Sequence, residues 1–202
     1  MKEIINKYKL DSDLTLWLEM INGSESAFSE LFELYNKTLV NYVYSFVKDK
    51  SMAQDCVQDV FMDVWIYRKK LQSTVLVKPY LLSAARKRLA RKLERDHIFF
   101  KSTNTDNIEF ALDFTIEYKI IADEQQLAQA LKLNEILNKL PARQKEAIYL
   151  RYFQGLNPQQ ISEILEVNYQ SVNNLIHRAV VHIKSQWGTD FSLLLLLISS
   201  NI

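Results

Sequence analysis

Residues 157–186 read NPQQISEILEVNYQSVNNLIHRAVVHIKSQ, and the fold class follows from this segment. The Asn-Pro pair that opens it is typical of a helix start, because Asn caps free backbone amides and Pro fits the first helical turn. We expect a short helix from Pro158, a tight turn at 166–168 and a longer helix over about 169–186. This order and spacing predict a helix-turn-helix.

The second of these helices is amphipathic, with a polar face opposite an apolar stripe. Asn and Gln side chains on such a face pair with adenine in the major groove of duplex DNA. The alternative is a helical hairpin that only packs, since such turns are common in helical proteins. The candidate DNA-binding residues of this face are Gln170, Ser171, Asn173, Asn174, His177 and Arg178.

The composition of the whole 202-residue chain also favours helices, because it holds only three glycines and three prolines. Tight β-hairpins and phosphate-binding loops need glycine, so the composition disfavours a β-sandwich, a dinucleotide-binding fold and a P-loop enzyme. Apolar residues at helical spacing predict two helices on either side of Gly23. Further helices are predicted over about 52–67, 79–95 and 143–153, with helical periodicity returning from about 127.

A basic block follows the helix predicted over 52–67. Residues 65–101 hold 11 Lys and Arg against 2 Asp and Glu, although the net charge of the chain is only +1. Such a cluster gains affinity for nucleic acid by displacing counterions from phosphates, whereas a solvated surface face is the alternative. Among the nearby aromatic residues, Tyr80 is the better candidate for stacking on a base, and Trp65 is expected in the core.

The exposed side of the helix over 52–67 is acidic, and its residues are Asp55, Gln58, Asp59, Met62 and Asp63. An acidic face of this kind fits a basic protein partner. On its own, the pattern is more typical of an ordinary polar surface.

The sequence does not indicate a catalytic site, a metal site or a membrane-spanning segment. Cys56 is a single cysteine on a helix with apolar neighbours, so we expect a buried thiol, and the scattered histidines lack metal-ligand spacing. No segment reaches the roughly 20 apolar residues that span a bilayer, and the N-terminal residues lack the apolar core of a signal peptide. We expect a cytoplasmic protein that is not an enzyme, needs no cofactor and does not insert into membranes.

Four segments, in order, resemble one known family. Residues 55–65 (DCVQDVFMDVW) resemble the second conserved region of bacterial sigma factors, and residues 78–86 (KPYLLSAAR) resemble the segment that follows it. Residues 140–144 (LPARQ) resemble the start of the fourth region, and residues 161–179 resemble its helix-turn-helix. The layout is similar to that of the extracytoplasmic-function (ECF) sigma factors.

This resemblance implies an all-α fold of two small helical domains that bind core RNA polymerase and promoter DNA, and an anti-sigma factor as a further partner. It implies sigma region two over 1–100, an acidic linker over 101–128 that threads the polymerase channel, sigma region four over 129–188 and an apolar tail over 189–202. The helix over 169–184 would enter the major groove at the minus-thirty-five element.

The resemblance also implies a role for individual residues of region two. The residues expected to bind the coiled coil of the polymerase β′ subunit are Asp55, Gln58, Asp59, Phe61 and Asp63. The loop over 69–78 would hold flipped bases of the minus-ten element. The residues expected at that element are Lys69, Lys70, Lys78, Tyr80, Arg86, Lys87, Arg88, Arg91, Lys92 and Arg95.

The sequence departs from the family pattern in the helix-turn-helix. Asn173 and Leu175 stand where basic residues are common, and Glu166 stands where the turn usually has glycine. Two alternatives therefore stay open: a helix-turn-helix regulator that binds duplex DNA without polymerase, and an interaction protein that keeps the scaffold without DNA binding.

Overall fold

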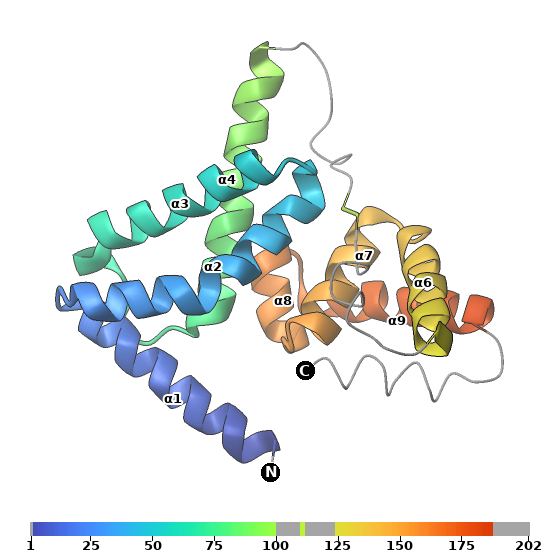
Figure 1. Cartoon of the computed structure of the whole chain (residues 1–202), viewed down its shortest axis with the longest axis horizontal. Helices are drawn as coiled ribbons and strands as arrows, with labels where there is room; N and C mark the ends of the chain where they lie inside the picture. The colour runs from blue at the N-terminus through green and yellow to red at the C-terminus, as the bar shows by residue number, and fades with distance from the viewer. Residues whose placement is uncertain (1, 100–109, 112–123, 188–202) are drawn as a thin grey trace. The chain divides into compact units, whose positions relative to one another are not determined.

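The computed structural model describes residues 2–99, 110–111 and 124–187, and the elements in these ranges are all helical. The chain divides into two compact units, Met1–Thr105 and Asp106–Ile202 (Figure 1). The predicted all-α fold class is confirmed. The predicted tail over 189–202 lies outside the described residues, as does most of the predicted linker.

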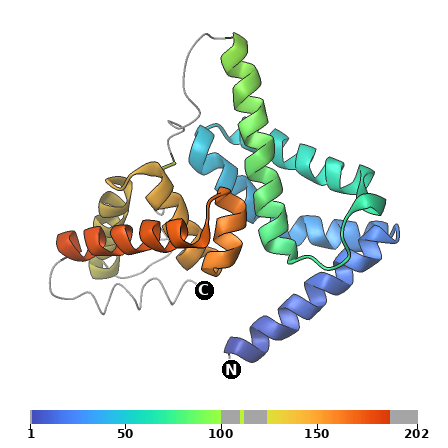
Figure 2. The ribbon, with the colours of Figure 1, turned by 180° about the vertical axis from the view of Figure 1, so that it is seen from behind.

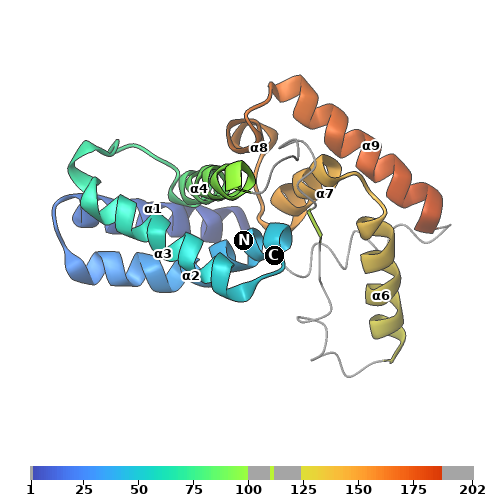
Figure 3. The same cartoon turned by 90° about the horizontal axis from the view of Figure 1, so that it is seen from above.

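Over residues 2–99, the first unit contains four α-helices and a short 3-10 turn. The helices are α1 (Lys2–Ile21), α2 (Glu25–Val47), α3 (Lys50–Ile66) and α4 (Val77–Phe99), and the turn is η1 (Arg68–Lys70). α1, α2 and α3 pack side by side, and α4 crosses the α2–α3 pair, so that it is seen almost end-on in Figure 3. Figure 2 shows the crossing from the side of α4.

The sequence determines the breaks between the first helices through local caps. Gly23 adopts φ +102°, a backbone conformation that glycine reaches more easily than other residues. The next residue, Ser24, caps α2, because its hydroxyl accepts a hydrogen bond from the Ala27 amide at 3.2 Å. The Asp49 carboxylate caps α3 in the same way, at 3.0 Å from the Met52 amide. The predicted helix break at Gly23 is confirmed.

The core of this unit is formed where the apolar stripes of the four helices meet. Trp17 of α1, Leu39 and Tyr42 of α2, Val57 of α3 and Leu82 of α4 are completely buried. Burial of such large side chains contributes about 1.5–3 kcal/mol each, which fixes how α3 and α4 lie against each other.

The second unit contains α6 (Glu124–Asn138), α7 (Ala142–Ile148), the π-helical turn η3 (Tyr149–Phe153), α8 (Pro158–Leu165) and α9 (Tyr169–Trp187). The helix predicted over 143–153 is present, but its second half is π-helical instead of α-helical. In this wider turn the Gln154 amide donates to the Tyr149 carbonyl at 3.1 Å, and the Leu156 amide then donates to the Leu150 carbonyl at 3.1 Å as the chain reverses. Gly155 at φ +69° makes that reversal possible.

The predicted helix-turn-helix is present as α8, a turn and α9. Asn157 and Gln160 form a reciprocal capping box at the start of α8. Asn168 caps α9, since its side-chain oxygen accepts from the Ser171 amide at 2.7 Å. Between the two helices, Glu166 ends α8 in the left-handed conformation with φ 55°. A side chain at this φ is strained, because its Cβ lies close to the backbone.

The end of the predicted linker differs from the expectation. α6 begins at Glu124, so the last part of the segment over 101–128 is helical, because polar helix formers precede the first apolar positions there. Phe110 is 1% exposed and packs against Tyr149, with ring centroids 5.7 Å apart. One aromatic side chain of the predicted linker is thus part of the core of the second unit.

The strained turn leads to a first prediction. Glu166→Gly stabilises the second unit by about 1 kcal/mol, since glycine adopts a left-handed conformation without strain. Hydrogen exchange of the α8 and α9 amides in the full chain measures the change. The matched control Glu163→Gly, in the interior of α8 and also exposed, destabilises by about 1 kcal/mol. Faster exchange in both variants would contradict the strain at Glu166.

Candidate functional site

The predicted polymerase-binding residues lie on α3, but they differ in exposure. Asp55 and Gln58 are exposed, whereas Asp59 and Asp63 are half-buried. Phe61 is 3% exposed and packs in the core against Phe32, with ring centroids 4.9 Å apart. Its side chain is therefore too buried to contact a partner. Phe61 can affect docking only indirectly, by holding α3 in place through core packing.

Two exposed apolar residues extend the acidic side of α3. Met62 and Ile66 are each 58% exposed and follow Gln58 at intervals of one helical turn. The exposure of Met62 agrees with the sequence prediction, whereas periodicity does not indicate that Ile66 also faces solvent. The acidic face of α3 is defined here as Asp55, Gln58, Asp59, Met62 and Asp63.

The acidic face and the basic helix α4 are joined by an ion pair. Arg88 of α4 donates to Asp59 at 2.7 Å and to Asp63 at 3.2 Å, one nitrogen to each carboxylate. The hydrogen bond to Asp59 raises the pKa of the Arg88 guanidinium above its ordinary value. Charge spacing along α4 does not reveal this pair, because Asp59 and Asp63 precede Arg88 by 29 and 25 positions.

The other predicted minus-ten residues lie mainly along α4 and before it. Lys69 and Lys70 of η1 are exposed, as are Lys87, Arg91 and Arg95 of α4. The remaining members are half-buried, and they are Lys78, Tyr80, Arg86 and Lys92. The structure therefore brings the predicted cations to one helix and the turn before it, with Arg88 turned toward α3.

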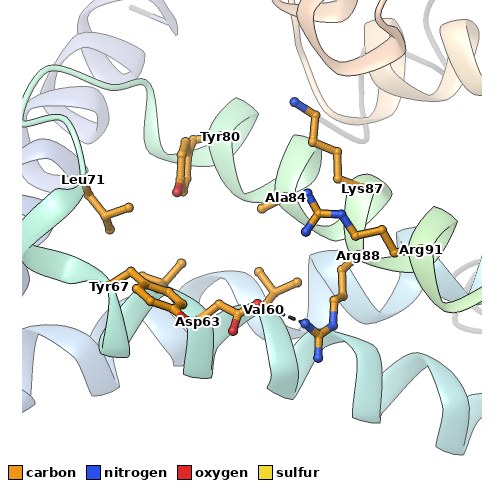
Figure 4. Close-up of a pocket in the computed structure, with 10 residues that line it drawn as sticks. Val60, Asp63, Tyr67, Leu71, Tyr80, Ala84, Lys87, Arg88 and Arg91 are labelled. Carbon is orange, nitrogen blue, oxygen red and sulfur yellow. Dashed lines mark hydrogen bonds and ion pairs between the residues drawn. The ribbon is translucent and has the colours of Figure 1, made fainter.

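A pocket of about 210 Å³ lies between α3 and α4 (Figure 4). Tyr67, just after α3, and Tyr80 of α4 contribute aromatic rings. Its apolar lining consists of Val60, Val64, Leu71 and Ala84, and its charged lining consists of Asp63, Lys87, Arg88 and Arg91. Arg88 points toward α3 in Figure 4, whereas Lys87 extends away from it. The pocket thus combines flat apolar surfaces with cations.

Two features of the pocket bear on what it binds. The Nε atom of Arg88 is buried, and its two terminal nitrogens pair with Asp59 and Asp63, so Arg88 contributes positive charge beside the pocket rather than a free N–H donor. Burial raises the pKa of the Tyr80 hydroxyl, so this ring stays neutral and can donate a hydrogen bond. An aromatic molecule with acceptor atoms fits this lining better than a purely apolar one.

The predicted DNA-binding face of α9 is accessible. Gln170, Asn174, His177 and Arg178 are exposed, and Ser171 and Asn173 are half-buried. The opposite side of the helix is buried at Val172, Ala179 and Ile183, as expected, while Ile176 is half-buried. The structure keeps all six predicted residues on the surface.

Cys56 is completely buried, as predicted, and burial raises the pKa of its thiol to about 11. A thiol with this pKa is a poor nucleophile at neutral pH. Within residues 2–99, 110–111 and 124–187, no three potential metal-ligating side chains lie together. In the same ranges, every helix is too short or too polar to cross a membrane.

Comparison with known proteins identifies both units. The family model for sigma-70 region 2 matches residues 31–97, and the model for sigma-70 region 4 matches residues 130–183. The first match contains α3, α4 and the pocket, and the second contains the helix-turn-helix. Together they cover more than half of the chain.

Curated relatives agree with this assignment. The ECF RNA polymerase sigma factor BldN of Streptomyces coelicolor is 26% identical over 84% of this chain, and the match spans 65% of that relative's own length. The ECF RNA polymerase sigma factor SigM of Bacillus subtilis is 24% identical over 79% of this chain and 94% of its own. These matches define a two-region initiation factor. The chain belongs to the sigma-70 family, in its extracytoplasmic-function group.

Solved structures show the same fold. CnrH, solved with the cytosolic domain of CnrY, gives a TM-score of 0.58 at 20% identity and covers 88% of this chain and 98% of its own. The sigma factor RpoE of Bartonella quintana, solved with the anti-sigma factor NepR, gives a TM-score of 0.60 at 20% identity, covering 81% and 98%.

The ion pair between α3 and α4 leads to a second prediction. A double-mutant cycle with Asp59→Ala and Arg88→Ala gives a coupling free energy of about 0.5–1 kcal/mol, because the pair is only partly exposed. Urea unfolding of the first unit in the four chains measures it. A second cycle with Asp59→Ala and Arg91→Ala is the control and gives a value near zero. Equal coupling in both cycles would show that Arg88 has no specific pairing.

Proposed function

We propose that this chain binds core RNA polymerase through the acidic face of α3, directs it to a class of promoters and stabilises the separated strands of the minus-ten element. The observation that carries this proposal is the position of the pocket. It lies between the helix with the acidic face and the helix with the cations, so docking and base binding use adjacent sides of one packed unit.

Charge and exposure support the docking step. Asp55 and Gln58 are exposed and precede the exposed apolar residues Met62 and Ile66 on the same helix. A basic helical partner with apolar residues at matching intervals, such as the β′ coiled coil of the polymerase, fits this combination. Charged residues then steer the encounter, and the two apolar residues give buried area at the centre of the interface.

Base binding is supported by the lining of the pocket. A base that leaves the duplex loses stacking and pairing worth a few kcal/mol, and these must be offset by the protein. Stacking on an aromatic ring contributes about 1–3 kcal/mol per base. Tyr67 and Tyr80 provide such rings, and Lys87 and Arg91 provide positive charge at the pocket. The exposed cations of α4 and η1 would bind the phosphates of the same strand.

The helix-turn-helix supports recognition of the minus-thirty-five element. The exposed face of α9 has amides at Gln170 and Asn174, which suit adenine, and a cation at Arg178, which suits guanine or phosphate. With few positive charges on this face, binding energy from base edges outweighs binding energy from phosphates.

We further propose that an anti-sigma factor binds this chain in the cytoplasm, where core polymerase is found. The support is the fold shared with two sigma factors whose solved structures contain CnrY and NepR, respectively. Such a partner would compete with polymerase for the acidic face.

The docking proposal leads to a third prediction. Asp55→Lys lowers the affinity for core polymerase by about tenfold or more, since a close charge pair across an interface contributes at least about 1.5 kcal/mol. Titration of labelled full-length chain with core polymerase measures the effect. Glu30→Lys on α2 makes the same charge change at an exposed site and serves as the control. Equal affinities of the two variants would remove α3 from the docking surface.

The DNA-binding proposal leads to a fourth prediction. Replacement of Arg91 and Lys92 by Gln makes promoter binding by holoenzyme less dependent on salt, with the slope of log K against log salt falling by about 0.7 per lost contact with the separated strand. The control replaces Lys37 and Lys50, two exposed lysines at other sites, by Gln. If both double variants keep the wild-type slope, α4 does not bind phosphates.

A further inference from the structure

The loop that precedes α4 is tied to the first helix by one tryptophan. Trp17 of α1 is 0% exposed, and its indole nitrogen donates a hydrogen bond of 3.0 Å to the backbone carbonyl of Gln72. The two residues are 55 positions apart in the chain. A buried indole N–H needs an acceptor, and here that acceptor belongs to a loop rather than to a helix.

The same tryptophan also contacts the pocket wall. The rings of Trp17 and Tyr80 meet edge to face, with centroids 5.1 Å apart and an interplanar angle of 65°. Tyr80 lies at the same end of the pocket as Leu71, the residue before Gln72 (Figure 4). One side chain of α1 thus positions the loop backbone and one of the two aromatic rings of the pocket.

The loop itself has little regular structure, and its polar side chains face solvent. Gln72, Ser73 and Thr74 are exposed. Backbone hydrogen bonds hold both ends of the loop. At its start the Leu71 amide donates to the Arg68 carbonyl at 3.2 Å, and at its end the Tyr80 amide donates to the Leu76 carbonyl at 3.0 Å. The bond from Trp17 lies between these two. A loop that is ordered before binding loses less conformational entropy when its side chains contact a ligand.

We propose that Trp17 is a positioning residue for base recognition. By fixing the Gln72 backbone and the Tyr80 ring, it sets which unpaired base the loop and pocket prefer, although it lies on a helix outside both. This inference rests on the proposed binding of unpaired minus-ten bases. Trp17 acts through Gln72 and Tyr80, and its own side chain is fully buried.

A purely structural role for Trp17 makes a different prediction. If its ring only filled the core, Trp17→Phe would lower stability and leave base preference unchanged at any temperature where the protein is folded. A positioning role predicts altered base preference even when the fold and the affinity for polymerase are kept. Phe is smaller than Trp and lacks the N–H group, so Trp17→Phe removes the hydrogen bond to Gln72 while it keeps an aromatic ring in the core.

The test uses holoenzyme reconstituted from core polymerase and the full chain. A library of single-stranded oligonucleotides with randomised bases is bound, and sequencing of the bound fraction gives the preference at each position. We expect Trp17→Phe to weaken the strongest preference by about tenfold, the size expected for loss of one hydrogen-bonded arrangement. In the free chain, the amides of residues 71–76 should exchange faster than in wild type, with the exchange in α2 and α3 unchanged.

The control is Val43→Ala, which destabilises the core from a fully buried position on α2 and leaves Trp17 in place. Unchanged preferences in Trp17→Phe, or an equal loss in Val43→Ala, would overturn the positioning role, and so would unchanged exchange over 71–76. Failure of the proposed function looks different: wild-type holoenzyme would then show no base preference, and the inference about Trp17 would fall with it.

Discussion

The rest of the first unit depends on how α3 is held against α4, and the ion pair of Arg88 with Asp59 and Asp63 is the polar part of that contact. It joins a helix with an acidic face to a helix with many cations by pairing one of those cations with two of the acidic side chains. The apolar part of the contact includes Val60 and Leu89, both buried. Together they fix the pocket between the two helices, because residues from both helices line it.

Under the proposed function, this arrangement would let one small unit bind two partners. Polymerase bound to the acidic face and DNA bound along α4 would be separated by only one helix–helix contact. Docking on polymerase would therefore bring the pocket and the loop before α4 to a fixed place in the initiation complex. Arg88 takes part on both sides, since it pairs with two acidic residues and also lines the pocket. The helix-turn-helix of the second unit adds a separate contact with duplex DNA.

The sequence predicted local features well and distant pairings poorly. The break at Gly23, the capping by Asn157 and the burial of Cys56 follow from neighbouring residues, and they are confirmed. The partners of Arg88 and the bond from Trp17 to Gln72 join separate helices and loops, where periodicity carries no information. For the same reason, periodicity could not show that Phe110 enters the core of the second unit, or that Ile66 remains exposed.

The central claim is that α3 binds polymerase while the loop before α4 binds the separated DNA strand in the same complex. Site-specific photo-crosslinking of the full chain in a holoenzyme–promoter complex tests it most directly, with the reactive group at Gln58 in one chain and at Thr74 in another. The account predicts that the group at Gln58 links to the polymerase β′ subunit and that the group at Thr74 links to the non-template strand. Crosslinks from Gln58 to DNA, or none from Thr74 to DNA, would contradict it.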